Sequence, residues 1–125
     1  MKLDMDLIRT ILVKVEADPS FDGSPENRNT DATRLGITGH DDAEVVYHLV
    51  QLVEAGMLAG NTRMASCGDV AISRLTPQGH QFLDDIRDTE IWGKTKERAK
   101  GIARAGLGLV WEIAKAEIKA KLGLV

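Results

Sequence analysis

The sequence has little of what secreted and membrane-spanning proteins need. Its 125 residues include one cysteine, Cys67, which excludes an internal disulfide and predicts a reducing compartment. No run approaches about 18 uncharged apolar residues, so a conventional membrane-spanning helix is excluded. The N-terminus carries two aspartates in a helical pattern, not a basic stretch followed by an apolar one, so we expect no secretion signal. These absences predict a cytoplasmic protein.

The chain has the length and composition of one globular domain. Hydrophobic residues make up 43% and charged residues 28%, both ordinary values for a protein with a packed core. The charge is uneven, since residues 1–89 hold 8 basic and 15 acidic residues and residues 90–125 hold 8 basic and 4 acidic residues. The sequence therefore predicts an acidic body and a basic tail that attract each other, within one chain or between chains.

Apolar spacing and turn residues predict the elements of the first part of the chain. In chain order we predict a helix over 4–17, a flexible loop over 18–34, a short strand over 35–38, a helix over 41–55, a hairpin over 57–75 and a helix over 77–87. The core face of the helix over 41–55 is predicted to consist of Val46, Leu49, Val50 and Val53.

The remaining residues have helical spacing and contain no proline. Three glycines, Gly101, Gly106 and Gly108, weaken helix formation and predict two helices with a break near 101–108, with one kinked helix as the alternative. The apolar face after residue 102 is too wide for a solvated helix, so this segment must pack on the body or on a second copy. We therefore predict two parts, a domain over 1–88 and a helical extension over 89–125.

This order of elements is typical of a winged helix, in which a helix leads through a glycine into a hairpin wing. The predicted fold class is mostly α (α+β), a winged-helix-like core with a C-terminal helical extension. The middle helix of the usual three-helix core is missing or replaced by residues 18–38, which argues against simple helix-turn-helix docking on DNA.

Four segments together resemble a bacterial and phage family known as domain of unknown function 2513. The segments are MKLDMDLIRTILVKVE, YHLVQLVEAGML, SRLTPQGHQFLDDIRDTEIWGKTKERAK and KAKLGL. The resemblance covers nearly the whole chain except the loop over 18–34. It implies a small winged-helix-like protein often carried by phages and prophages, and it lends no established activity and no catalytic or binding residue.

The sequence leaves two functions open, a protein-interaction module and a winged-helix DNA-binding regulator. DNA affinity comes largely from lysine and arginine, whereas Asp41 and Glu44 lie on the outward face of the helix over 41–55 and repel phosphates. We therefore favour a non-enzymatic module that binds a protein partner, a second copy included. The candidate residues for contact with a partner or with DNA are Tyr47, His48, Gln51, Arg63, Lys94, Lys96, Arg98 and Lys100. The candidate oligomer interface is formed by Ile102, Leu109, Trp111 and Ile113.

No residue pattern indicates an enzyme. His40, Asp41 and Asp42 resemble a metal or acid–base cluster, but the aspartates are explained by a helix start, and His48 lies about 12 Å further along the helix. Cys67 has no adjacent histidine or cation that would make it a thiolate. We expect no catalytic residue, no metal site and no cofactor.

Overall fold

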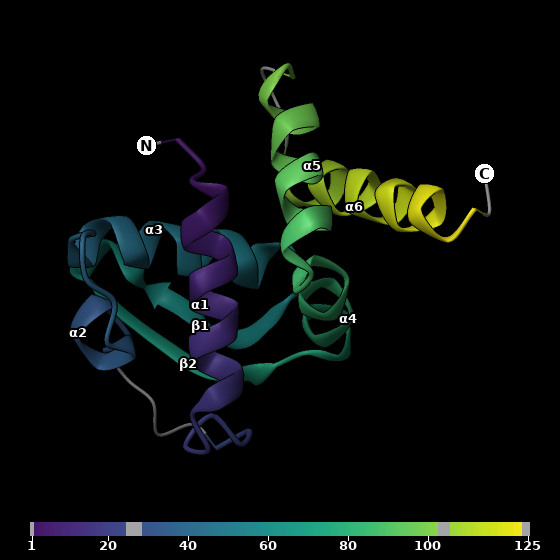
Figure 1. Ribbon diagram of the computed structural model, residues 1–125. Coiled ribbons are helices and arrows are strands. Elements are labelled where there is room, and N and C mark those ends of the chain that lie inside the picture. The colour runs from purple at the N-terminus through teal and green to yellow at the C-terminus, as the bar shows by residue number, and fades with distance from the viewer. Residues whose placement is uncertain (1, 25–28, 103–105, 124–125) are drawn as a thin grey trace. The chain divides into compact units, whose positions relative to one another are not determined.

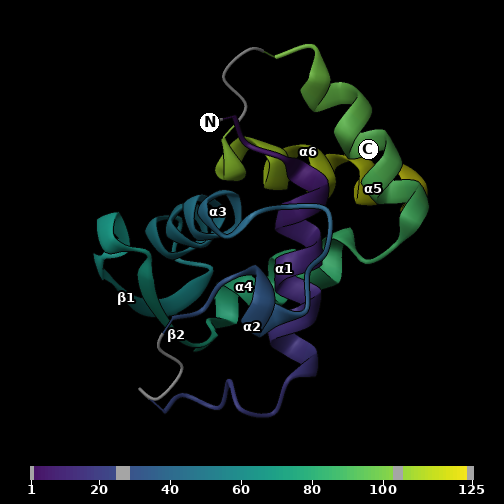
Figure 2. The same cartoon turned by 90° about the vertical axis from the view of Figure 1, so that its left-hand side faces the viewer.

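The computed structural model describes residues 2–24, 29–102 and 106–123 (Figures 1 and 2). They form two compact units, unit 1 over Met1–His80 and unit 2 over Gln81–Val125. The predicted division lay later in the chain, after residue 88. Two residues of the predicted loop and basic tail, Pro25 and Arg104, lie outside the described residues.

Unit 1 contains three helices followed by an antiparallel hairpin. In chain order its elements are α1 (Met5–Ala17), α2 (Ala32–Leu35), α3 (Asp42–Glu54), β1 (Leu58–Met64), the 3₁₀ turn η1 (Ala65–Cys67), β2 (Asp69–Leu75) and the start of α4 (Pro77–Ile86). The helix α1 packs on α2, α3 and β2, and α3 packs on both strands (Figure 1). The core of unit 1 lies between these helices and the hairpin.

The predicted first helix is confirmed as α1. The Oδ1 atom of Asp4, the N-cap residue, accepts a hydrogen bond from the Leu7 backbone N–H at 3.1 Å. This cap satisfies one of the free N–H groups at the helix start. The predicted apolar stripe is buried throughout and consists of Leu7, Ile8, Ile11, Leu12 and Val15.

The predicted short strand over 35–38 is wrong, because a one-turn helix, α2, precedes and overlaps it. The Oδ1 atom of Asp31 accepts a hydrogen bond from the Arg34 N–H at 2.9 Å, and Gly36 ends the turn in the left-handed conformation with φ 68°. Asp and Gly are favoured at these two positions for their cap geometry. A short helix thus lies between α1 and α3, within the segment 18–38 that was predicted to replace a middle helix if one was not missing.

The described part of the predicted flexible loop is bonded and partly buried. Its backbone N–H groups at Gly23 and Thr30 donate to the carbonyl oxygens of Ser73 and Val70 in β2 at 3.0 and 2.8 Å. Phe21 is buried. Long-range hydrogen bonds from Gly23, Asn29 and Thr30 thus join the described part of this loop to the hairpin.

The helix α3 has the predicted position but a different core face. Its buried residues are Val45, Val46, His48, Leu49 and Leu52. Val50 and Val53, predicted in the core, are half-buried. The register is shifted because a histidine occupies the core, and a periodicity of apolar residues does not detect it.

The hairpin and the start of α4 have the predicted positions. The strands β1 and β2 pair antiparallel, with Leu58 opposite Leu75, and the register shifts beside Gly60. The Thr76 hydroxyl donates to the Gly56 carbonyl at 2.6 Å and accepts from the Gly79 N–H at 3.0 Å. A Cβ atom at Gly79 would lie 2.0 Å from the carbonyl oxygen of Met57, so this helical position requires glycine.

Unit 2 contains the rest of α4 and two further helices, α5 (Thr89–Lys100) and α6 (Leu107–Leu122). The prediction of two helices is confirmed, and the predicted fold class, mostly helical with one antiparallel hairpin, is confirmed as well. The Lys121 ammonium near the end of α6 bonds to Asp88, the N-cap of α5, at 2.9 Å. Among the residues that the structure describes, none of the helices has the length and apolar character needed to cross a membrane.

Candidate functional site

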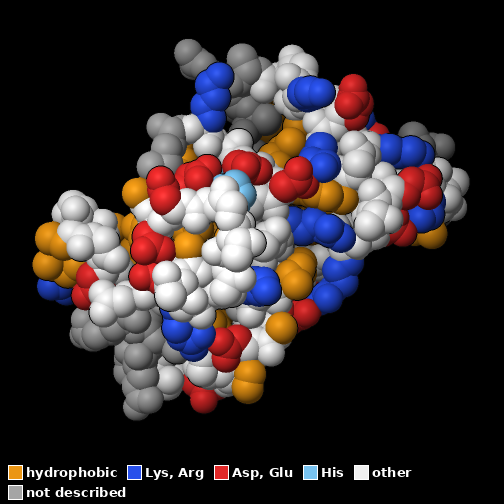
Figure 3. Space-filling view, turned by 60° about the vertical axis from the view of Figure 1, so that its left-hand side comes forward, with side chains coloured by type: hydrophobic (Ala, Val, Ile, Leu, Met, Phe, Trp, Pro, Cys, Tyr) orange, Lys and Arg blue, Asp and Glu red, His pale blue; other side chains and the backbone are white. Residues whose placement is uncertain are grey.

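The partner face predicted on α3 borders an open groove of about 590 Å³. The lining residues come from α3, from the turn between the strands and from the N-cap of α2, and they are Asp31, Asp42, Ala43, Val46, Tyr47, Val50, Ala65, Ser66 and Gly68. Four of the nine lining residues are aliphatic or aromatic side chains of α3, and two carboxylates lie among them. Figure 3 shows the same combination on one face, with hydrophobic and acidic side chains side by side. The groove therefore offers an apolar surface beside negative charge.

The groove carboxylates are held in place by backbone hydrogen bonds. Asp42 Oδ1 accepts from the Ala32 N–H at 3.1 Å, which joins the start of α3 to α2. Asp31 Oδ1 caps α2, as described above, and Asp41 Oδ1 caps α3 through the Glu44 N–H at 2.8 Å. Each cap fixes the position of a negative charge without neutralising it, so the field on this side of unit 1 favours a cationic partner.

The predicted contact residues of unit 1 are separated by the structure. Tyr47 is half-buried and lines the groove. Gln51 is half-buried on α3 and does not line it, and Arg63 is exposed on β1. Only Tyr47 of these three is brought to the groove.

His48 is not available to a partner. It has no exposed surface. The prediction that His48 lies on the outward face of α3 is therefore wrong, because its long-range partner, the Asp4 backbone, is not visible from the sequence. Its Nε2 accepts a hydrogen bond from the Asp4 backbone N–H at 2.8 Å, and its Nδ1 lies 2.7 Å from the Glu44 carbonyl oxygen. Because Nε2 accepts, the proton is on Nδ1 and the ring is neutral. His48 therefore joins the start of α1 to the start of α3.

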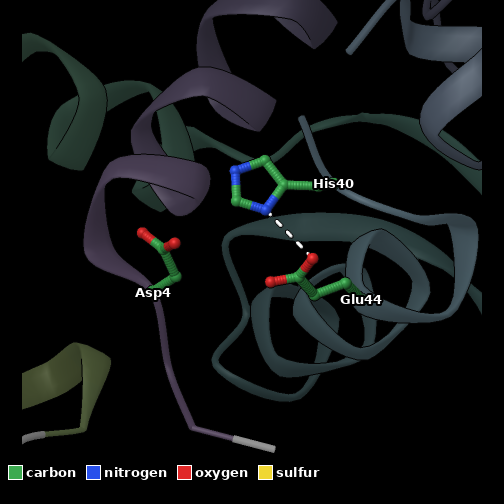
Figure 4. Close-up of side chains that lie close together, drawn as sticks. All are labelled: Asp4, His40 and Glu44. Carbon is green, nitrogen blue, oxygen red and sulfur yellow. Dashed lines mark ion pairs between the residues drawn. The ribbon is translucent and has the colours of Figure 1, made fainter. Parts of the chain in front are cut away.

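A second cluster of side chains consists of Asp4, His40 and Glu44, and His48 contacts the backbone of two of these residues. One donor atom from each of the three residues lies within 4.8 Å of the other two. Figure 4 shows the three side chains close together, with His40 facing Glu44; they come from the start of α1, the segment before α3 and the first turn of α3. The distance from His40 Nδ1 to Glu44 Oε1 is 3.1 Å. The predicted grouping of His40 with Asp41 and Asp42 differs from the observed cluster of Asp4, His40 and Glu44. The observed cluster could not be predicted because Asp4 is distant from His40 in the chain.

The His40 nitrogen that faces Glu44 is incompletely satisfied. Nδ1 is buried, and the contact with Oε1 is close enough for an ion pair but not aligned as a hydrogen bond. Among the described residues, this nitrogen has no hydrogen-bond partner. Buried polar atoms are usually hydrogen-bonded, so the orphaned atom requires an explanation.

Much of the predicted basic tail is engaged within unit 2. Lys94 pairs with Glu90 at 3.2 Å, and Arg98 pairs with Glu117 at 3.0 Å. The Lys96 ammonium lies 5.9 Å from the centroid of the Trp92 ring, and Lys100 is exposed. These contacts reduce the positive charge that α5 presents to a polyanion.

The predicted oligomer interface is divided between buried and exposed side chains. Trp111 donates from Nε1 to Asp85 Oδ2 at 2.7 Å and meets the Phe82 ring edge-on. Ile113 is buried. Ile102 and Leu109 are 42% and 39% exposed, so these two remain accessible to a second copy.

Comparison with known proteins places the chain in a family. The model of the family described as hypothetical protein (DUF2513) matches residues 2–105. An uncharacterised protein of Haemophilus influenzae (strain ATCC 51907 / DSM 11121 / KW20 / Rd) is 36% identical over 103 residues, which cover 80% of each chain. No solved structure matches the chain. The chain therefore belongs to the DUF2513 family, a family of unknown function.

Proposed function

We propose that the protein is a non-enzymatic interaction module whose groove beside α3 binds a partner protein. The partner inserts an apolar side chain that has basic residues next to it in the partner's own sequence. The observation that carries this proposal is the lining of the groove, where Val46, Tyr47 and Val50 lie beside the carboxylates of Asp31 and Asp42. An apolar floor supplies affinity, and the fixed charges select the partner and its orientation.

The dimensions of the groove suit a short segment of polypeptide. Pockets of about 300–1,000 Å³ hold a small ligand or a few anchoring side chains, and this groove has about 590 Å³. Amphipathic helices bind such grooves with apolar anchors spaced one turn apart. Lysine or arginine beside the anchor would meet Asp31 or Asp42 at the groove.

The distribution of charge favours a protein partner over DNA. A helix that reads the major groove is surrounded by phosphates, which require cations on the protein. The start of α3 instead carries Asp41, Asp42 and Glu44, and backbone N–H groups hold the carboxylates of Asp41 and Asp42 in place. We propose further that the protein is a small accessory protein of the phage or prophage type that acts on another protein.

Selection from a random peptide library tests the proposal. Wild-type protein is used to select binders, which are then measured against Ala43→Arg, a variant that adds bulk and positive charge to the groove. Gln51→Ala is the matched control, because Gln51 lies on α3 and does not line the groove. We expect selected peptides with an aliphatic or aromatic residue next to lysine or arginine. Their affinity should fall at least tenfold for Ala43→Arg and remain within about twofold for Gln51→Ala.

Two results would contradict the proposal. The first is a set of peptides that bind Ala43→Arg as well as wild type, since the groove would then not be the binding surface. The second is salt-sensitive binding of random duplex DNA that is abolished by Arg63→Ala, which would favour the DNA-binding regulator. Light scattering during size exclusion, with and without DNA, also measures self-association, and a dimer abolished by Leu109→Asp but not by Ala43→Arg would identify a second copy bound through α6 and not through the groove.

A further inference from the structure

We infer that Asp4, His40 and Glu44 form a binding site for a divalent transition-metal ion of the zinc type. This site is independent of the groove and of the proposed function. It rests on the donor atoms, their spacing, an unsatisfied nitrogen and the support beneath them.

The donor set is one that zinc selects. Imidazole nitrogen and carboxylate oxygen are both common zinc ligands, whereas Mg²⁺ and Ca²⁺ prefer oxygen atoms alone. Two carboxylates and a neutral imidazole balance the charge of a dication. Three protein ligands leave at least one coordination position to water.

The spacing of the donors is close to that of a tetrahedral site. Bonds of about 2.0–2.2 Å in a tetrahedron place neighbouring donor atoms about 3.3–3.6 Å apart. His40 Nδ1 and Glu44 Oε1 are 3.1 Å apart, and all three residues have a donor within 4.8 Å of the other two. The limit of 4.8 Å exceeds the tetrahedral spacing by about 1 Å, so the Asp4 carboxylate would approach the other two donors by at most about that amount. Its Oδ1 caps α1, so Oδ2 is the oxygen that would turn toward the ion.

The orphaned nitrogen of His40 gains a partner in this arrangement. Nδ1 is buried and faces Glu44 without an aligned hydrogen bond. A metal ion requires only the lone pair of a neutral imidazole. The side chains of His40 and Glu44 are 26% and 35% exposed, so an ion can reach them from solvent.

His48 holds the backbone of two ligand residues in place. This buried ring bonds to the backbone N–H of Asp4 and lies within hydrogen-bond distance of the backbone carbonyl of Glu44. Two of the three ligand residues are therefore held at a fixed spacing by one imidazole. Rigid support of this kind raises the affinity of a metal site because the ligands need not be ordered on binding.

Titration with zinc and cobalt tests the inference. The protein is freed of metal with a chelator, carries no histidine tag and is titrated with Zn²⁺ by calorimetry and with Co²⁺ by visible absorption. We expect one equivalent of Zn²⁺ to bind, Co²⁺ to give the visible bands of nitrogen and oxygen coordination, and Mg²⁺ to bind at least a hundredfold more weakly. Zn²⁺ should also raise the melting temperature, because it binds the folded state.

Three variants remove one ligand each while preserving local structure. Asp4→Asn keeps an N-cap residue, Glu44→Gln keeps the shape of the side chain, and His40→Asn removes the imidazole. Each should weaken Zn²⁺ binding at least tenfold. His80→Gln is the control, because His80 is an exposed histidine outside the cluster and its loss should change the affinity less than twofold.

Three outcomes would overturn the inference. One is the absence of binding at micromolar Zn²⁺ in wild-type protein whose melting curve is normal, which would leave His40 and Glu44 as an ion pair only. Another is unchanged affinity in all three ligand variants. The last is equal affinity for Mg²⁺ and Zn²⁺, which would indicate attraction by the acidic surface and not coordination.

Discussion

Unit 1 and unit 2 use their polar side chains in different ways. In unit 1, the buried ring of His48 meets residues of two helices that are far apart in the chain, Asp4 and Glu44. In unit 2, the buried hydroxyl of Thr95 bonds within its own helix, and the contacts between α5 and α6 include exposed ion pairs such as Arg98–Glu117. Buried long-range hydrogen bonds impose one geometry, whereas exposed ion pairs are weak and adaptable. Unit 2 has a long-range bond of its own, from Trp111 to Asp85, but Trp111 is half-buried, whereas His48 has no exposed surface; both candidate sites lie in unit 1.

Removal of His48 should have the largest effect. His48→Ala leaves the Asp4 N–H without its acceptor and opens a cavity, so we expect a loss of about 4 kcal/mol in the free energy of unfolding. Urea denaturation measures it, with His80→Ala as the exposed control, expected within about 0.5 kcal/mol of wild type. His48→Gln, which keeps a donor and an acceptor, should lose less. Equal stability of His48→Ala and His80→Ala would contradict the role of His48.

Alanine substitutions at two helical glycines, one in each unit, should have the second largest effect on stability, with opposite signs. A Cβ atom at Gly79 would lie 2.0 Å from the Met57 carbonyl oxygen, so Gly79→Ala should cost about 2–3 kcal/mol because backbone must move. A Cβ atom at Gly93 in α5 has open space, because no described atom beyond its chain neighbours and the nearby backbone of its own helix lies within 4 Å. Gly93→Ala should therefore stabilise the protein by about 0.5–1 kcal/mol. Melting curves of both variants check the pair, and a change of the same sign in both would refute the contrast.

Acid should weaken unit 1 through Asp18. The Arg34 guanidinium, with help from Ser20, lowers the pKa of the Asp18 carboxyl from 3.8 to about 2. The folded state therefore gains stability from this group above pH 3.8, and the gain is lost as the pH falls through about 2. Asp18→Asn should show a smaller loss of unfolding free energy between pH 4 and 2 than wild type. Arg34→Gln should raise the Asp18 pKa in an NMR titration, and an unchanged pKa would contradict the assignment.

The exposed ion pairs of unit 2 should contribute least to the stability of the protein. The hydrogen bond from Lys121 lowers the pKa of the Asp88 carboxyl, and the bond from the Ile91 backbone N–H at the start of α5 lowers it by a smaller amount. The Lys121→Met substitution should raise the pKa of Asp88. The melting temperature of this variant at physiological salt should hardly differ from that of wild type, because exposed ion pairs are screened. The difference should grow at low ionic strength. A large loss of stability at all salt concentrations would mean that unit 2 depends on this pair as strongly as unit 1 depends on His48.

The elements were predictable from the sequence where a local pattern determines them. The stripe of α1, the Asp41 cap of α3 and the Thr76–Pro77 start of α4 are local signals, and the helices begin where these signals place them. The single turn of α2 is too short for a periodicity, so its caps at Asp31 and Gly36 were the only signal and were not recognised.

The candidate metal site and the core face of α3 were not predictable in this way. His48 is buried because the Asp4 N–H lies opposite it, a contact between residues 44 positions apart. The same fold brings Asp4 to His40 and Glu44. Charge and spacing along one helix contain no information about such a partner. The groove was anticipated only in part, through Tyr47, since its other wall comes from the turn between the strands.

The hydrogen bonds from Gly23 and Thr30 to β2 also bear on aggregation. An open strand edge is a template for strands of other molecules. One edge of β2 is paired with β1, and the loop bonds to carbonyl oxygens of β2 at Val70 and Ser73. The β1 strand carries the charge of Arg63, and its register shifts beside Gly60, both of which disfavour continuous pairing. The two-stranded sheet is thus poorly suited to grow by strand addition, so the addition of a strand from a second copy is a disfavoured way for this protein to associate.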